Sequence, residues 1–323
     1  MNQRIKEIGK KIVGLIPTKI WISYRFKKKM GYPMDWKNPK TFNQKLQWLK
    51  VYDRRPLYTT MVDKYAAKEY VSNIIGEKYI IPTLGVWDSF DEIDFDTLPD
   101  QFVLKCTHDS GGLIIVRDKA SLDKRSARKK FKIALKRNPY SVTREWPYKN
   151  VKPRIIAERY INDDKLRPDE NAATNGSVSS EWLQKKHGLL DYKFLCSNGK
   201  VRVLFLDIGV IGEGEAHADD YYRNVYDREG NELPFKETRE HYPRPVSLPN
   251  NFKDMVNIAE TLSKGIPCLR VDLYRLNTGD IKVGELTFFH GSGMSNHFTP
   301  REWDETLGSW ITLPPKTKGR EKR

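Results

Sequence analysis

The final two predicted strands bring two acidic side chains face to face, and this pairing limits the folds open to the chain more than any other feature. Segments 268–274 and 281–287 alternate between apolar and polar residues, as half-buried strands do. The turn at 277–280 joins them, so a regular hairpin places Asp272 opposite Glu285. Opposed side chains lie about 4.5–5.5 Å apart at Cβ, where two carboxylates repel each other. A Mg²⁺ ion between them would remove this repulsion.

The same register places Arg270 opposite Thr287, on the face that carries the two acids. An arginine beside a metal ion could bind phosphoryl oxygens through two parallel hydrogen bonds. The alternative is a surface hairpin with an ordinary charge network, and a β-bulge would break the assumed register.

A Gly-rich turn after an earlier strand is the second candidate element. Strand 101–105 ends in a lysine, and small residues at 106–112 separate it from strand 113–116. Backbone N–H groups of such a turn can surround phosphate oxygens, and the lysine adds a positive charge. The spacing is that of neither a P-loop nor GxGxxG, and an ordinary hairpin turn is the alternative. His108 and Asp109 in this turn could form a catalytic pair or lie exposed.

A third strand, 154–158, ends in Glu158 and is followed by Tyr160 and Ile161. Such a strand could present backbone groups to the edge of a nucleotide base. An edge strand with a solvated glutamate is the alternative.

Periodicity and turn residues predict the remaining elements. The region 40–75 is expected to be helical, with Thr41 as the first N-cap and a second helix from Thr60 to Ser72. Further helices are expected over 121–137 and from Phe252 to Gly265. Asn198-Gly199 predicts a hairpin between strands 192–197 and 200–206. The polar residues 165–190 are expected to form an exposed insertion.

The net charge of +15 indicates an anionic partner: nucleic acid, a membrane surface, phosphates or an acidic polymer. The cations are dispersed and match no nucleic-acid-binding module, so we expect no nucleic acid partner.

The three cysteines (Cys106, Cys196 and Cys268) are too far apart for a zinc motif and fit a reducing compartment. We recognise no signal peptide and no segment of about 20 apolar residues, so we expect a cytoplasmic protein.

The first 30 residues combine isoleucines at helical spacing with many lysines. This pattern fits peripheral contact with the anionic inner face of the membrane, and it fits a packed helix with a solvated basic side equally well.

Taken in order, these pieces resemble the ATP-grasp superfamily. More closely they resemble its TupA-like family, which is named for teichuronopeptide synthesis and occurs in bacterial polysaccharide gene clusters. The resemblance runs from about Asn38 to Leu313 and is most specific in the stretches 102–112, 145–150, 269–274 and 284–288.

The resemblance implies an α+β fold in which two α+β lobes clamp a nucleotide, preceded by a basic helical region. The expected regions are a basic helical N-terminal region at 1–60, an N-terminal lobe of the ligase at 61–100, a small lobe with the Gly-rich lid at 101–160, a large lobe with the metal site and the insertion 165–190 at 161–313, and a basic tail at 314–323.

The resemblance also implies the cofactors ATP and Mg²⁺ and assigns roles to residues. Phosphate and nucleotide binding falls to Lys64, Lys105, Ser110, Gly111, Gly112, Glu158, Tyr160, Ile161, Asp191 and Lys193, catalysis to Arg270 and Lys105, and metal binding to Asp272, Glu285 and Thr287. Candidate substrate contacts are His108, Trp146, Tyr148, Arg223, His290 and Ser292. The family usually has Asn at the position of Thr287, whose hydroxyl is a weaker metal ligand.

The expected activity is formation of an amide through an acyl phosphate. The substrates would be a sugar acid of a bacterial surface polysaccharide and an amine such as an amino acid. A sugar kinase with the same fold, a sugar-nucleotide glycosyltransferase and a nucleic-acid binder are the alternatives.

Overall fold

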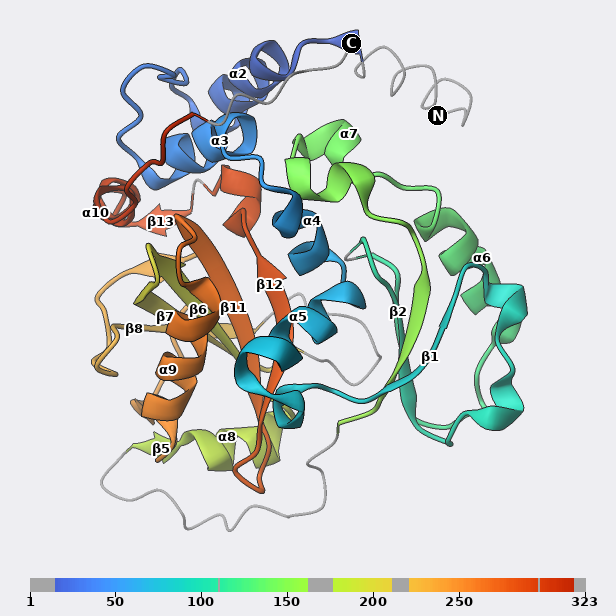
Figure 1. Cartoon of the computed structure of the whole chain (residues 1–323). Coiled ribbons are helices and arrows are strands. Elements are labelled where there is room, and N and C mark those ends of the chain that lie inside the picture. The colour runs from blue at the N-terminus through green and yellow to red at the C-terminus, as the bar shows by residue number, and fades with distance from the viewer. Residues whose placement is uncertain (1–14, 110, 162–176, 211–220, 296, 317–323) are drawn as a thin grey trace.

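The computed structural model describes residues 15–109, 111–161, 177–210, 221–295 and 297–316. Two main antiparallel sheets organise this part of the chain, and they lie on either side of helices α4 (Pro56–Val62) and α5 (Ala66–Ile75) (Figure 1). None of the helices in these ranges is both long and apolar enough to cross a membrane.

The smaller sheet has four strands and its own hydrophobic core. Its order is β1 (Thr83–Trp87), β4 (Ile155–Arg159), β2 (Phe102–Cys106) and β3 (Leu113–Val116). Helix α6 (Lys124–Ala134) buries Ala127 and Phe131 in this core and leaves its basic residues exposed. Asp123 caps the helix, because its side chain accepts the backbone N–H groups of residues 125 and 126.

The larger sheet has five strands. Its order is β12 (Ile281–Thr287), β11 (Cys268–Arg275), β6 (Asp191–Ser197), β7 (Lys200–Ile208) and β8 (Tyr222–Tyr226). Helix α9 (Phe252–Ser263) packs Met255, Ala259 and Leu262 against this sheet, at the helical spacing that the sequence shows.

Shorter elements complete the two lobes. They include α2 (Thr18–Met30), α3 (Phe42–Tyr52), α7 (Tyr140–Thr143), η4 (Trp146–Asn150), β5 (Val178–Ser179), α8 (Ser180–His187), β9 (Lys236–Glu237), β10 (Val246–Ser247), η5 (His290–Gly293), β13 (Phe298–Thr299) and α10 (Trp303–Ser309).

Both predicted hairpins are confirmed. Asn198 and Gly199 have φ values of 53° and 75° between β6 and β7, as an Asn-Gly turn requires. In the β11–β12 pair, Asp272 faces Glu285 and Arg270 faces Thr287. The register shifts by one residue immediately after Asp272, so the bulge leaves the two carboxylates opposed.

Two predicted elements are wrong. The helix expected from Thr60 to Ser72 is broken at Asp63, whose carboxylate accepts the backbone N–H groups of Tyr65 and Ala66 and a hydrogen bond from Arg154. The insertion expected at 165–190 is not exposed in its second part, because Leu183 of α8 is fully buried. Its residues 165–176 lie outside the described ranges.

Lys50 of α3 is fully buried and hydrogen-bonds two segments that are distant from it in sequence. Its Nζ donates to the carbonyl oxygen of Thr143 at 3.0 Å and to that of Ser292 at 2.7 Å. Burial is the main reason that the pKa of Lys50 falls to about 8.

Helix α3 begins with the N-cap that the sequence predicts, Thr41, which forms a capping box with Gln44. The Thr41 side chain accepts the backbone N–H of Gln44 at 3.2 Å, and the Gln44 side chain accepts the N–H of Thr41 at 3.4 Å. The same first turn carries Asn43, which hydrogen-bonds Asp304 of α10, so this cap also positions a tertiary contact.

We expect Thr41→Ala to destabilise the protein by about 1 kcal/mol, because the substitution removes the cap. The melting temperature should fall by roughly 2–4 °C in differential scanning calorimetry. Thr41→Ser, which keeps the hydroxyl acceptor, is the control. Equal melting temperatures for both variants would show that the cap has no energetic role.

Candidate functional site

A mainly apolar pocket opens between the two sheets. Its volume is about 160 Å³, and it is partly open to solvent. Val103 and Ile115 line it from the smaller sheet, and Tyr274 lines it from the larger one. The predicted residues Tyr160 and Ile161 lie at the pocket, as do the polar residues Lys105, Glu158 and Asp191.

Glu158 holds two lysines at the edge of this pocket. Its carboxylate lies 2.5 Å from Nζ of Lys105 and 2.7 Å from Nζ of Lys68, and only 5% of the side chain is exposed. Burial alone would raise the pKa of Glu158, but the two ammonium groups keep it below its ordinary value. The sequence prediction missed Lys68, which lies four residues after Lys64; a second lysine at that spacing was the signal that could have identified it.

The opposed carboxylates lie next to two cations. Arg270 donates from Nε and Nη2 to the two oxygens of Asp272 at 2.6 Å each, and Lys64 Nζ lies 3.2 Å from Glu285. Burial raises the pKa of Glu285, but Lys64 and Arg270 outweigh it and hold the pKa at about 2. Thr287 accepts a hydrogen bond from Arg270 at 3.2 Å through its hydroxyl.

This acidic pair fits a magnesium ion that shares its ligands with phosphates. Among the described residues, no three His, Cys, Asp or Glu side chains are grouped to hold a metal on their own. Mg²⁺ is usually held by one or two carboxylates together with substrate phosphates and water. Asp272 and Glu285 could provide the two carboxylates.

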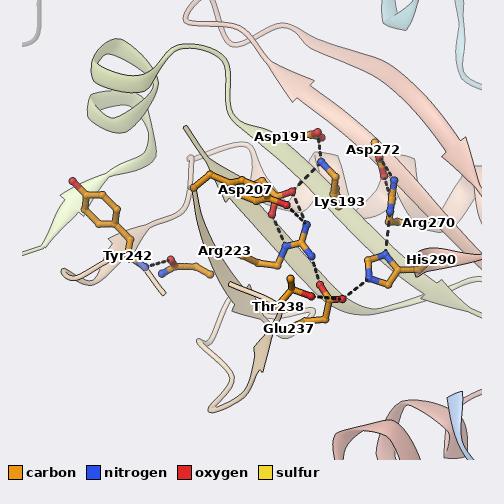
Figure 2. Close-up of polar contacts among 12 residues, drawn as sticks. Asp191, Lys193, Asp207, Arg223, Glu237, Thr238, Tyr242, Arg270, Asp272 and His290 are labelled. Carbon is orange, nitrogen blue, oxygen red and sulfur yellow. Dashed lines mark hydrogen bonds and ion pairs between the residues drawn. The ribbon is translucent and has the colours of Figure 1, made fainter. Parts of the chain in front are cut away.

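A buried chain of charges runs through the larger lobe beside this pair (Figure 2). Lys193 contacts Asp191 and lies 3.1 Å from Asp207. Burial is the main reason that the pKa of Asp191 is raised. Arg223 donates to Asp207 at 2.6 and 2.7 Å and also contacts Glu237.

The predicted substrate contacts are only partly supported by these positions. Arg223 is 6% exposed and fully engaged by two carboxylates, so the geometry gives it a structural role instead. His290 is buried between Arg270 and Glu237, and the Ser292 hydroxyl donates to Glu145 at 2.6 Å. The sequence prediction also missed Asp207 and Glu237, because nothing local marks them.

Two aromatic candidates, Trp146 and Tyr148, lie in η4 and are partly exposed. Burial, followed by the charge of Glu285, raises the pKa of the Tyr148 hydroxyl, which places this ring close to the acidic pair.

The Gly-rich turn is anchored by Arg137. His108 is buried, with Nε2 3.1 Å from the Arg137 carbonyl oxygen, and Asp109 pairs with the Arg137 guanidinium at 3.2 Å. The two residues therefore do not form a catalytic pair with each other. A Cβ on Gly112 would lie 2.5 Å from Cys106 Sγ, so only glycine fits there. Ser110 lies outside the described residues, and the adjacent Gly111 is exposed.

A sequence model of the TupA-like ATP-grasp family matches residues 44–169 and 180–312. The chain belongs to this family. Its two lobes are therefore those of an ATP-grasp fold, and membership supports ATP-dependent ligation in general terms.

Solved structures related to this ATP-grasp chain are distant. One is an L-amino acid ligase from Bacillus licheniformis, with 16% identity and a TM-score of 0.42 over 75% of this chain and 47% of that one. Another is an ADP complex of N5-carboxyaminoimidazole ribonucleotide synthetase, with 13% identity and a TM-score of 0.42 over 86% and 59%. The chain thus spans about half of the L-amino acid ligase. No curated protein matches it.

If the ATP-grasp site lies between the sheets, Asp272→Asn and Lys105→Ala should each remove most of the thermal stabilisation by ATP with Mg²⁺. A free ligand concentration about 100-fold above Kd stabilises a folded protein by about 2.7 kcal/mol. Differential scanning fluorimetry with and without nucleotide measures this gain. Asp280→Asn, in the turn of the same hairpin, is the control and should keep it. A full nucleotide shift in both site variants would place ATP elsewhere.

Proposed function

We propose that this chain is an ATP-dependent ligase that joins a carboxylic acid to an amine through an acyl phosphate. The observation that carries the proposal is a group of cations from different parts of the fold: Lys64 pairs with Glu285 and Arg270 with Asp272. Lys105 pairs with Glu158 of the smaller sheet and adds a third positive charge to the same cleft. Phosphoryl transfer depends on alignment and on neutralising charge, which such a group of cations provides.

A carboxylate needs activation because it is a poor electrophile. Bound ATP would supply the γ-phosphoryl group: a carboxylate oxygen bonds to the γ-phosphorus, and the bond to the β–γ bridging oxygen breaks. The amine then attacks the acyl carbon, phosphate leaves, and the nitrogen loses a proton. Lys64, Lys105 and Arg270 would hold the phosphate oxygens, and closure of the lid at 108–112 would keep water from hydrolysing the acyl phosphate.

The acid is proposed to be a sugar acid of a bacterial surface polysaccharide, and the amine an amino acid. The resemblance to the TupA-like family, which is named for teichuronopeptide synthesis, supports this substrate class. The charge of +15 supports it as well, because an acidic glycan is attracted to a basic protein.

The substrate proposal is tested by measuring ATP turnover with a panel of uronic acids and amino acids. We expect ADP and phosphate only when both an acid and an amine are present, with an amide product in mass spectrometry. A stable phosphorylated sugar formed without amine would instead identify a kinase. Release of AMP would rule out the acyl-phosphate route.

Helix α2 supports the further proposal that the enzyme works at the inner face of the membrane. Ile20 and Tyr24 are 62% and 59% exposed on one side of this helix, and Lys27 and Lys28 continue that side. Apolar side chains beside lysines are typical of helices that lie on anionic lipid.

We expect Ile20→Ser combined with Tyr24→Ser to reduce co-sedimentation with phosphatidylserine-containing vesicles about tenfold, because the apolar contact is lost. Ile133→Ser is the matched control, since Ile133 is 49% exposed on the basic helix α6. Equal binding by the double variant and the wild type would exclude this face of α2.

A further inference from the structure

We propose that His290 and Glu237 are positioning residues that orient Arg270 toward the terminal phosphate of the nucleotide. This inference rests on the proposed function, because it gives Arg270 a phosphate to reach. Neither residue lines the pocket between the sheets.

Packing fixes the plane of the His290 ring. The ring is 4% exposed and stacks on Phe205 of β7, with centroids 5.1 Å apart and planes 9° from parallel. Phe42 of α3 contacts it at a centroid distance of 6.5 Å. A ring held in this way has little freedom to turn, so the direction of its nitrogen atoms is set by the fold.

The Nδ1 atom of His290 lies 3.0 Å from Nη1 of Arg270. A guanidinium group can only donate hydrogen bonds, so Nδ1 must accept with its lone pair. The ring proton then lies on Nε2, which faces Oε1 of Glu237 at 3.5 Å. At that distance the Nε2 contact is mainly electrostatic, and it favours this tautomer over the other.

Glu237 is itself held in place from two sides. Ser295 donates to its Oε1 at 2.6 Å, and Arg223 contacts its Oε2. Arg223 is fixed in turn by its two hydrogen bonds to Asp207. The chain of contacts from β7 to Arg270 therefore alternates in charge up to the neutral histidine, and each buried ion in it has a partner.

The contacts of Arg270 leave one donor available within the described residues. A guanidinium has five N–H groups, of which Asp272 accepts two and Thr287 and His290 accept one each. The remaining N–H is on Nη1, the nitrogen that His290 holds. Phosphate binding by this last donor thus depends on the histidine contact.

The test compares affinities for β,γ-imido-ATP and ADP, both with Mg²⁺, by isothermal titration calorimetry. His290→Phe keeps a stacked ring but removes the acceptor. We expect it to lose about tenfold in affinity for the triphosphate analogue, the worth of one charged hydrogen bond, while ADP affinity is unchanged. His290→Asn, whose amide oxygen can take the place of Nδ1, should restore the preference.

Phe298→Leu truncates a buried ring that contacts Phe42 and Phe235, and it is the control for a general loss of packing. Its nucleotide preference should equal that of the wild type. If His290→Phe does not fold, the test compares His290→Asn with His290→Gln. The longer glutamine amide would extend toward Glu237, so His290→Gln should not restore the preference for the triphosphate analogue over ADP. Equal weakening of both nucleotides, or no change, overturns the inference. Failure of the wild type to bind either nucleotide counts against the proposed function instead.

Discussion

Each buried or half-buried carboxylate of the cleft contacts a cation, and the rest of the site depends on this pairing. An isolated buried charge is strongly unfavourable, so Glu158, Asp191, Asp272 and Glu285 could not remain ionised together without their partners. The partners are lysines and arginines from both lobes. Nucleotide phosphates entering the cleft would meet cations already held in place by carboxylates, so binding involves an exchange of ion pairs.

A single short segment connects this charge pattern to the arrangement of the lobes. Lys64 donates its backbone N–H to the Thr107 carbonyl oxygen of the smaller lobe, and its side chain reaches Glu285 of the larger lobe. The preceding Asp63 binds Arg154 at the start of β4. The break between α4 and α5 is therefore what allows one lysine to contact both lobes, and a continuous helix would prevent it.

Local patterns predicted much of the fold and the centre of the site. Strand alternation and a turn placed Asp272 opposite Glu285, because strand registers follow a period of two and a short turn leaves little choice. The break at Asp63 was not predicted, because its carboxylate, besides accepting the N–H groups of Tyr65 and Ala66, pairs with Arg154, far along the chain. Asp207 and Glu237 were missed for the same reason: their partners come from other strands, and their own segments look like ordinary ones.

The buried Lys50 affects how the protein responds to alkaline conditions. In the unfolded chain this amine would lose its proton near the ordinary lysine pKa of 10.5, whereas burial lowers the pKa to about 8 in the folded protein. Between these two pH values the unfolded chain binds more protons, so the contribution of Lys50 to folding free energy improves as pH rises. Mild alkali should therefore stabilise the folded protein through Lys50, at the junction of α3, α7 and η5.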